Sequence, residues 1–90
     1  MISISALFEG KVQGVGFRSS VLSLAKGYEV TGWVKNLPDG RVEVYASGNA
    51  DEIDEFLQGI RESHLAGHID HVNVTPVEPE PATRGFRIID

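Results

Sequence analysis

Gly10-Lys11-Val12-Gln13-Gly14-Val15-Gly16-Phe17-Arg18 is the stretch at which the hydrophobic period of this chain changes. Before it, residues 2–8 alternate, with Ile2, Ile4, Ala6 and Phe8 on one face, which is typical of a half-buried strand. After it, the apolar residues are spaced for one face of a helix: Phe17, Val21, Leu24 and Ala25. The stretch itself is rich in glycine, so the sequence predicts a strand, a tight loop and a helix in direct succession.

Residues 30–47 are predicted to form a β-hairpin. Residues 30–36 and 42–47 both alternate between apolar and other side chains. Between them, Leu37-Pro38-Asp39-Gly40 has the composition of a tight turn, with proline second and glycine fourth.

A second helix is predicted from Asn49 to near His64. Asn49 is a suitable N-cap, and Glu52 stands three residues later as its capping-box partner. Gly59 lies inside this helix, where we expect it to allow close packing on the sheet. The buried stripe of the helix is expected to comprise Ile53, Phe56, Leu57 and Ile60.

The remaining segments complete a six-element pattern. A strand is predicted over residues 69–77, prolines indicate a loop or sheet edge over residues 76–84, and a short strand is predicted over residues 86–89. The order β-α-β-β-α-β indicates an α+β fold of the ferredoxin-like split βαβ type. We expect one domain over residues 1–90, with an antiparallel sheet, two helices on one face and a short extra C-terminal strand.

The glycine-rich loop is a candidate phosphate site. In this topology it leads into the first helix, whose N-terminus offers unpaired N–H groups and a partial positive charge. Arg18 stands at the start of that helix, where its guanidinium could bind a phosphate with two donors. Each feature taken alone also has a purely structural interpretation. The glycine-rich loop can be only a tight turn, and Arg18 can be only a solvated surface charge. The predicted phosphate-binding loop comprises Gln13, Gly14, Val15, Gly16, Phe17 and Arg18.

Asn36 is the second candidate functional residue. It ends the strand that runs parallel to the first, so it is expected at the same sheet edge as the loop. It stands an even number of residues from Val30 and Val34 and so lies on the same face of the strand, which is expected to place its side chain on the helix side. One intervening strand sets the backbone gap at about 10 Å, which two side chains and a phosphate can span.

Composition excludes several kinds of protein. The net charge is −5, from 13 acidic and 8 basic residues, which argues against a nucleic-acid partner but not against one small anion. There is no cysteine, and no leader or membrane span is evident, so we expect a cytoplasmic protein. We expect His64, His68 and His71 to be surface residues rather than metal ligands.

Two motifs resemble the acylphosphatase family. They are the nine-residue stretch quoted first, and Gly32-Trp33-Val34-Lys35-Asn36-Leu37-Pro38-Asp39-Gly40-Arg41-Val42-Glu43-Val44; Gly48 and Gly85-Phe86 also fit. The resemblance covers essentially the whole chain. It implies hydrolysis of the carboxyl–phosphate bond of a small-molecule acyl phosphate, with no metal or organic cofactor. It also implies that Arg18 and loop amides bind the phosphate while Asn36 orients the attacking water. Inorganic phosphate or sulfate should bind as a product-like ligand, and a monomer is expected.

The chain departs from the family pattern at two places. Arg41 stands where serine or threonine is common, and residues 63–68 lack the Gly-Pro that often follows the second helix. Three alternative functions stay open on the residues alone. They are a non-catalytic ligand-binding or regulatory module, the front module of a larger maturation enzyme, and an RNA-binding domain. An RNA-binding domain of this fold uses paired aromatic residues on its central strands, and this sequence lacks them.

Overall fold

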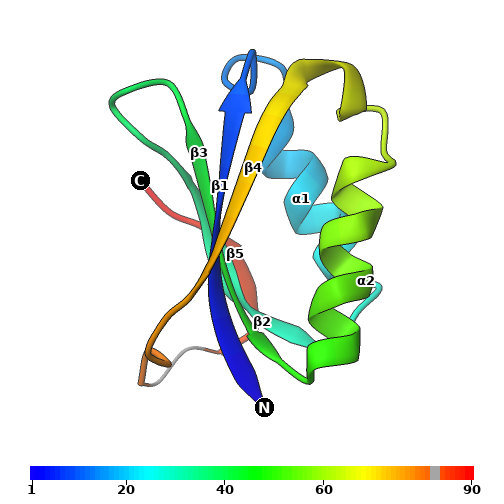
Figure 1. Cartoon of the computed structure of the whole chain (residues 1–90), viewed down its shortest axis with the longest axis vertical. Helices are drawn as coiled ribbons and strands as arrows, with labels where there is room; N and C mark the ends of the chain where they lie inside the picture. Colours follow the sequence, from blue (N-terminus) through cyan, green and yellow to red (C-terminus); the bar gives the residue numbers. More distant parts are fainter. Residues whose placement is uncertain (82–83) are drawn as a thin grey trace.

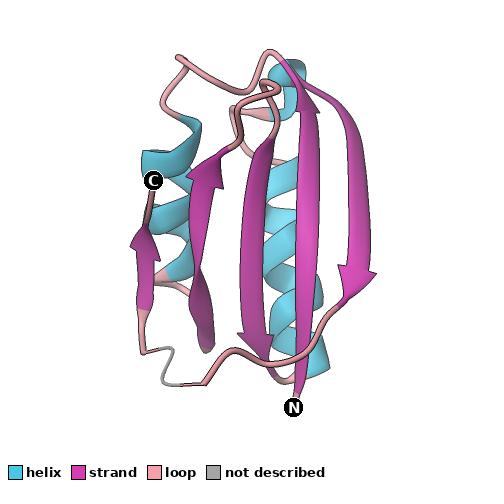
Figure 2. Cartoon of the chain, turned by 90° about the vertical axis from the view of Figure 1, so that its left-hand side faces the viewer, coloured by secondary structure: helices cyan, strands magenta, loops and turns pink. Residues whose placement is uncertain are grey.

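A five-stranded sheet carries two helices on one face (Figures 1 and 2). The computed structural model describes residues 1–81 and 84–90. The strand order is β4-β1-β3-β2-β5. The elements are β1 (Ile2–Gly10), α1 (Phe17–Ala25), β2 (Val30–Asn36), β3 (Val42–Gly48), α2 (Ala50–Arg61), the 3₁₀ turn η1 (Ala66–His68), β4 (Ile69–Pro76) and β5 (Phe86–Ile88).

The predicted α+β ferredoxin-like arrangement is confirmed, with one refinement. The pairs β1–β3, β1–β4 and β2–β3 are antiparallel, as expected. The short strand β5 pairs in parallel with β2, so the complete sheet is mixed rather than purely antiparallel.

The core lies between the sheet and the helices. It is built from one face of each strand of the β1–β3–β2 unit and the apolar stripes of both helices. Phe8 and Phe17 pack with ring centroids 5.2 Å apart, joining β1 to α1 at the loop end of the molecule. The most buried residues of the core include Ala6, Val21, Val34, Val44, Phe56, Ile60 and Leu65.

Strand register brings the ends of β1 and β2 to one edge. Phe8 and Asn36 both pair with Val42 of β3, so the three residues form a row across the sheet. Because β1 and β2 are both antiparallel to β3, they run parallel to each other and end at the same edge. The loop that follows β1 is therefore near Asn36, as the sequence predicted.

The face of the sheet away from the helices carries a small aromatic cluster. Trp33 stacks on Tyr45 with centroids 5.6 Å apart, and the Lys35 ammonium lies 5.1 Å from the Trp33 ring. Trp33 Nε1 donates to Glu80 Oε1 at 2.9 Å, and the Glu80 N–H donates to the Tyr45 hydroxyl at 2.8 Å. Trp33 therefore packs on the outer face of the sheet, where Glu80, which follows β4, is hydrogen-bonded to both aromatic side chains.

Two expectations about α2 were wrong in detail. Asn49 is the N-cap residue but makes no side-chain capping bond. Glu52 Oε1 instead accepts a 2.7 Å hydrogen bond from the Glu29 N–H, so no capping box forms. Gly59 approaches the Tyr28 hydroxyl rather than the sheet, since a Cβ there would lie 2.9 Å from that oxygen.

The remaining differences concern element ends. α2 ends at Arg61, earlier than expected. Ser63 Oγ donates to the Ile60 carbonyl at 2.7 Å and accepts from the Leu65 N–H, which turns the chain away from the helix. β4 and β5 end at Pro76 and Ile88, each one residue before the predicted end.

Candidate active site

The loop between β1 and α1 presents backbone N–H groups at the start of a helix. Gly14 and Gly16 have φ of 78° and 77°, the left-handed region that side chains disfavour. Gly16 is the N-cap residue of α1, and the first helical hydrogen bond runs from the Ser20 N–H to the Gly16 carbonyl at 3.0 Å. The N–H groups of residues 17–19 precede that bond and form the positive end of the helix dipole.

A small pocket of about 110 Å³ lies at this helix end. Its size and its backbone donors suit one tetrahedral anion. Arg18 and Asn36 both contribute to it, so the structure brings the two predicted functional residues together. The lining residues are Val12, Gly14, Gly16, Phe17, Arg18, Ser19 and Asn36.

Asn36, which lines this pocket, carries an unpartnered acceptor. Its Oδ1 atom is buried and has no hydrogen-bond partner among the described residues. A buried polar atom is normally paired, and leaving one unpaired costs about 1–3 kcal/mol. The pocket therefore needs a hydrogen-bond donor beside Asn36, which a water molecule can supply.

Arg18 is held only loosely. Its side chain is 36% exposed, and its Nη1 lies 3.9 Å from a carboxylate oxygen of Asp90, which is fully exposed. Such surface ion pairs contribute little to stability. An anion in the pocket can therefore compete with Asp90 for the guanidinium.

Gln13 does not point its side chain at the phosphate pocket. Its Nε2 donates to the Leu37 carbonyl at 2.8 Å and to the Arg41 carbonyl at 3.0 Å. These two carbonyls belong to the turn that follows Asn36, so the Gln13 side chain fastens the loop to that turn. Val15 is half-buried and packs against the core. Neither residue lines the pocket, so any contribution they make to anion binding comes from the backbone.

Arg41 is engaged within its own turn. Its N–H donates to Asp39 Oδ1 at 3.0 Å, and its Nε donates to Asp39 Oδ2 at 2.8 Å. The Arg41 backbone N–H, followed by its guanidinium, lowers the pKa of the Asp39 carboxyl below its usual value. Arg41 does not line the pocket.

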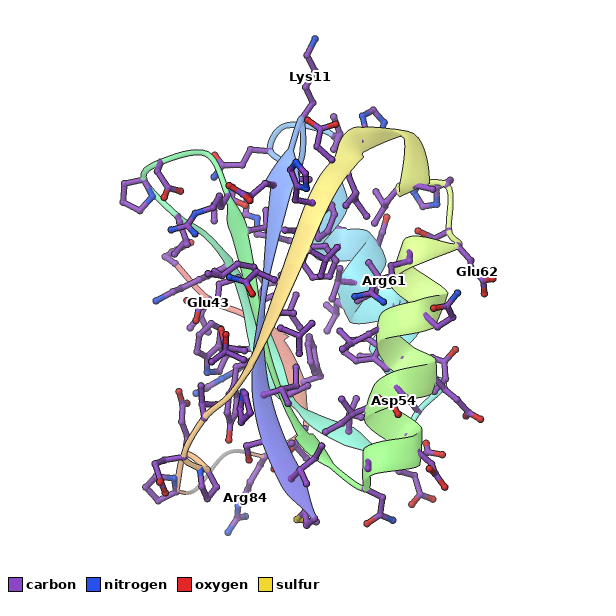
Figure 3. All side chains as sticks on the ribbon, viewed as in Figure 1. Lys11, Glu43, Asp54, Arg61, Glu62 and Arg84 are labelled. Carbon is purple, nitrogen blue, oxygen red and sulfur yellow. The ribbon has the colours of Figure 1, made fainter. Side chains whose placement is uncertain are left out.

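Lys11 is a charged residue of the loop that does not line the pocket. Lys11 projects away from the tip of the loop (Figure 3). Within residues 1–81 and 84–90, no three side chains of the His, Asp and Glu type lie close enough to hold a metal ion, and this applies to His64, His68 and His71.

Together, fold and pocket define a class: an α+β protein with a pocket at the N-terminus of its first helix whose size and donors suit one small anion. A family model described as Acylphosphatase matches residues 4–88. The chain therefore belongs to the acylphosphatase family, and it is an enzyme of that family.

Individual relatives agree with this assignment. The chain is 38% identical to the acylphosphatase of Chlorobaculum tepidum over 86 aligned residues. This alignment covers 96% of this chain and 94% of the relative. It superposes on the crystal structure of acylphosphatase from Bacillus subtilis with a TM-score of 0.90, at 31% identity over the whole of both chains. It also resembles HypF of T. kodakarensis, with a TM-score of 0.87 and 27% identity, but over only 12% of that longer chain.

Proposed function

We propose that this chain hydrolyses the carboxyl–phosphate bond of acyl phosphates by direct attack of water. The observation that carries the proposal is the buried, unpartnered Oδ1 of Asn36, a residue that lines the same pocket as Arg18 and the N-terminus of α1. A water bound to that oxygen stands beside the phosphate site, and alignment of water and phosphorus is the main requirement of the reaction.

Arg18 and the backbone N–H groups of residues 15–18 hold the phosphoryl oxygens. The guanidinium supplies two donors in one plane, and the helix dipole adds a fixed partial charge. These groups stabilise the charge that spreads over the phosphoryl oxygens in the transition state. The loop N–H groups need not move during the reaction, because the left-handed glycines already set the shape of the loop.

The reaction requires no general acid. The water oxygen forms a bond to phosphorus while the bond from phosphorus to the acyl oxygen breaks, and the acyl group departs as a carboxylate. That carboxylate is stable without a proton. Asparagine is not a base, so the proton of the attacking water passes to a phosphoryl oxygen of the substrate. The products are the carboxylate and inorganic phosphate.

The direct test is hydrolysis of benzoyl phosphate, followed by ultraviolet absorbance. Phenyl phosphate is the matched control, because its phenolate leaving group is far more basic than a carboxylate. We expect turnover of benzoyl phosphate and almost none of phenyl phosphate. Absence of benzoyl phosphate hydrolysis by the folded chain would leave the non-catalytic ligand-binding module as the better reading.

We further propose that residues 1–90 act as one monomeric domain in the cytoplasm, with inorganic phosphate or sulfate as a product-like ligand. Both candidate functional side chains and the loop come from one chain, so the site needs no second copy. None of the described helices is long and apolar enough to cross a membrane. Light scattering in the presence and absence of phosphate measures the molar mass and so tests whether the chain is monomeric.

A further inference from the structure

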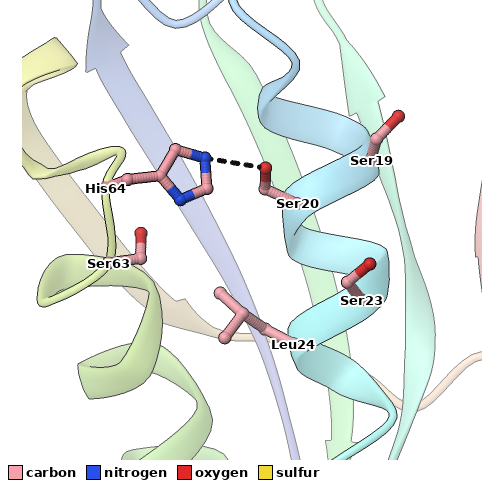
Figure 4. A pocket seen from close by; sticks show the side chains of 6 residues that line it. All are labelled: Ser19, Ser20, Ser23, Leu24, Ser63 and His64. Atoms are coloured by element: carbon pink, nitrogen blue, oxygen red, sulfur yellow. Dashed lines mark hydrogen bonds between the residues drawn. The ribbon is translucent and has the colours of Figure 1, made fainter.

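A second depression lies beside the phosphate pocket, between α1 and the segment that follows α2. We call it the inter-helix groove. Its volume is about 390 Å³. Ser20 Oγ and His64 Nε2 lie 3.1 Å apart in a hydrogen bond that spans the gap between the two segments (Figure 4). The groove is lined by Ser19, Ser20, Ser23, Leu24, Ser63 and His64.

The inter-helix groove and the phosphate pocket share one lining residue. Ser19, in the first turn of α1, lines both. Asn36 belongs to the sheet, whereas the groove lies among the helices, so the first turn of α1 separates them. In-line displacement places the attacking water and the leaving oxygen on opposite sides of phosphorus. With the water at Asn36, the leaving acyl group is directed toward the helix layer.

We propose that the inter-helix groove receives the acyl group of the substrate, and that it favours an uncharged group larger than acetyl, such as an aromatic ring. This inference rests on the proposed function and specifies its substrate class.

The chemistry of the groove walls fits such a group. None of the six lining residues is Asp, Glu, Lys or Arg, and the His64 imidazole is engaged with Ser20, so the walls favour an uncharged acyl substituent. Leu24 is half-buried and supplies an apolar surface, and four serines supply hydroxyl groups around it. Pockets of roughly 300–1,000 Å³ take small organic ligands in proteins, and the groove volume lies within that range. An acetyl group fills little of this space and gains little from it.

The test is a substitution that fills the groove without touching the phosphate pocket. Ser23 is exposed on α1 and does not line that pocket, so Ser23→Trp places an indole over the groove at small expected cost to folding. The kcat/KM ratio of benzoyl phosphate to acetyl phosphate is measured with the inhibition constant for inorganic phosphate. We expect Ser23→Trp to lower the ratio at least about tenfold, as loss of an apolar contact to substrate does. Acetyl phosphate turnover and phosphate inhibition should stay near wild type.

Two controls accompany this variant. Ser23→Ala keeps the groove open, so it should leave the ratio unchanged. Gln58→Trp adds the same side chain at an exposed position of α2 that does not line the groove, and it should also leave the ratio unchanged.

The possible failures are distinguishable. If wild type hydrolyses both substrates and Ser23→Trp leaves their ratio unchanged, the groove is not the acyl site and the proposed function stands. An equal loss for both substrates with unchanged phosphate inhibition also overturns the acyl site. If the folded wild type hydrolyses neither substrate, the proposed function fails, and the acyl site with it.

Discussion

In the proposed mechanism, Arg18 is the residue whose charge the reaction depends on most. It lines the phosphate pocket, and its present partner Asp90 is fully exposed and 3.9 Å away. We predict that Arg18→Ala lowers kcat/KM by at least about 10²–10³, the effect of removing one transition-state donor elsewhere. Inhibition by inorganic phosphate should be lost as well. Steady-state kinetics with benzoyl phosphate measures both quantities, and near-normal phosphate affinity in this variant would show that the anion binds elsewhere.

Asn36 has a different task, so its removal should have a different signature. We predict that Asn36→Ala lowers kcat by about 10²–10³ but changes phosphate inhibition by less than about threefold, because water positioning is lost and anion binding is kept. Its thermal unfolding midpoint serves as the control for folding. Equal losses of binding and turnover would assign Asn36 to the anion or to the fold instead.

The sequence indicated these two residues for reasons that the structure bears out in part. Alternation along residues 30–36 predicted the orientation of Asn36, and both residues line the pocket. The unpartnered state of Asn36 Oδ1 could not be predicted, because it depends on every atom around it. The role of the Gln13 side chain was missed for a similar reason. Its acceptors are two carbonyls more than twenty residues away, and no periodicity signals such a bond.

Between elements, the Gln13 side chain connects the phosphate loop to the β2–β3 turn. We predict that Gln13→Leu lowers the free energy of unfolding by about 1–3 kcal/mol, since two hydrogen bonds are lost while each turn carbonyl keeps one backbone N–H donor. It should lower kcat more than phosphate affinity, because the turn follows Asn36 directly while the loop keeps its own glycines. Chemical denaturation and the kcat-to-Ki comparison measure the two effects. Loss of phosphate affinity alone would indicate that Gln13 serves the anion.

A second prediction at this scale concerns the β2–β3 pair. Gly32 has a φ of 153°, and a Cβ there would clash with the Tyr45 carbonyl oxygen. We predict that Gly32→Ala lowers the free energy of unfolding by more than about 3 kcal/mol, within the range of severe core changes. Gly27→Ala is the control, because a Cβ there meets its nearest atom at an ordinary 3.5 Å. Equal stability of the two variants in denaturant titrations would contradict the close approach of β2 to β3.

Elements were easier to predict than the contacts between them. The hairpin and both helices follow from hydrophobic period and turn chemistry, which are local properties. The partner of Glu52 is Glu29, which stands before β2 and reaches α2 only when the chain has folded. A local capping box was therefore the natural expectation, and a tertiary hydrogen bond replaced it.

At the scale of the whole molecule, topology assembles the site. The order β4-β1-β3-β2-β5 brings the loop after β1 and the end of β2 to one edge, with the N-terminus of α1 beside them. The six-element order of the sequence predicted this edge. The parallel pairing of β5 with β2 was not predicted, because a three-residue strand carries too little pattern to specify its neighbour.

The absence of a metal requirement is a prediction about the molecule as a whole. In the proposed mechanism, Arg18, a helix N-terminus and Asn36 supply the charge stabilisation and alignment that a metal provides in many phosphoryl-transfer enzymes. We predict that extensive dialysis against a chelator changes kcat/KM for benzoyl phosphate by less than about twofold, a small effect on the scale of transition-state stabilisation. Restoration of a large lost activity by added divalent cations would contradict this.

The measurement that tests the central claim most directly is a crystal structure of the chain with inorganic phosphate. We predict a phosphate ion in the pocket lined by Gly14, Gly16 and Arg18, bound by the N–H groups of residues 15–18 and by the guanidinium. We also predict an ordered water hydrogen-bonded to Asn36 Oδ1 and facing the phosphorus atom. A phosphate bound away from Arg18, or an Asn36 Oδ1 that accepts its hydrogen bond from another protein group, would contradict the proposed mechanism.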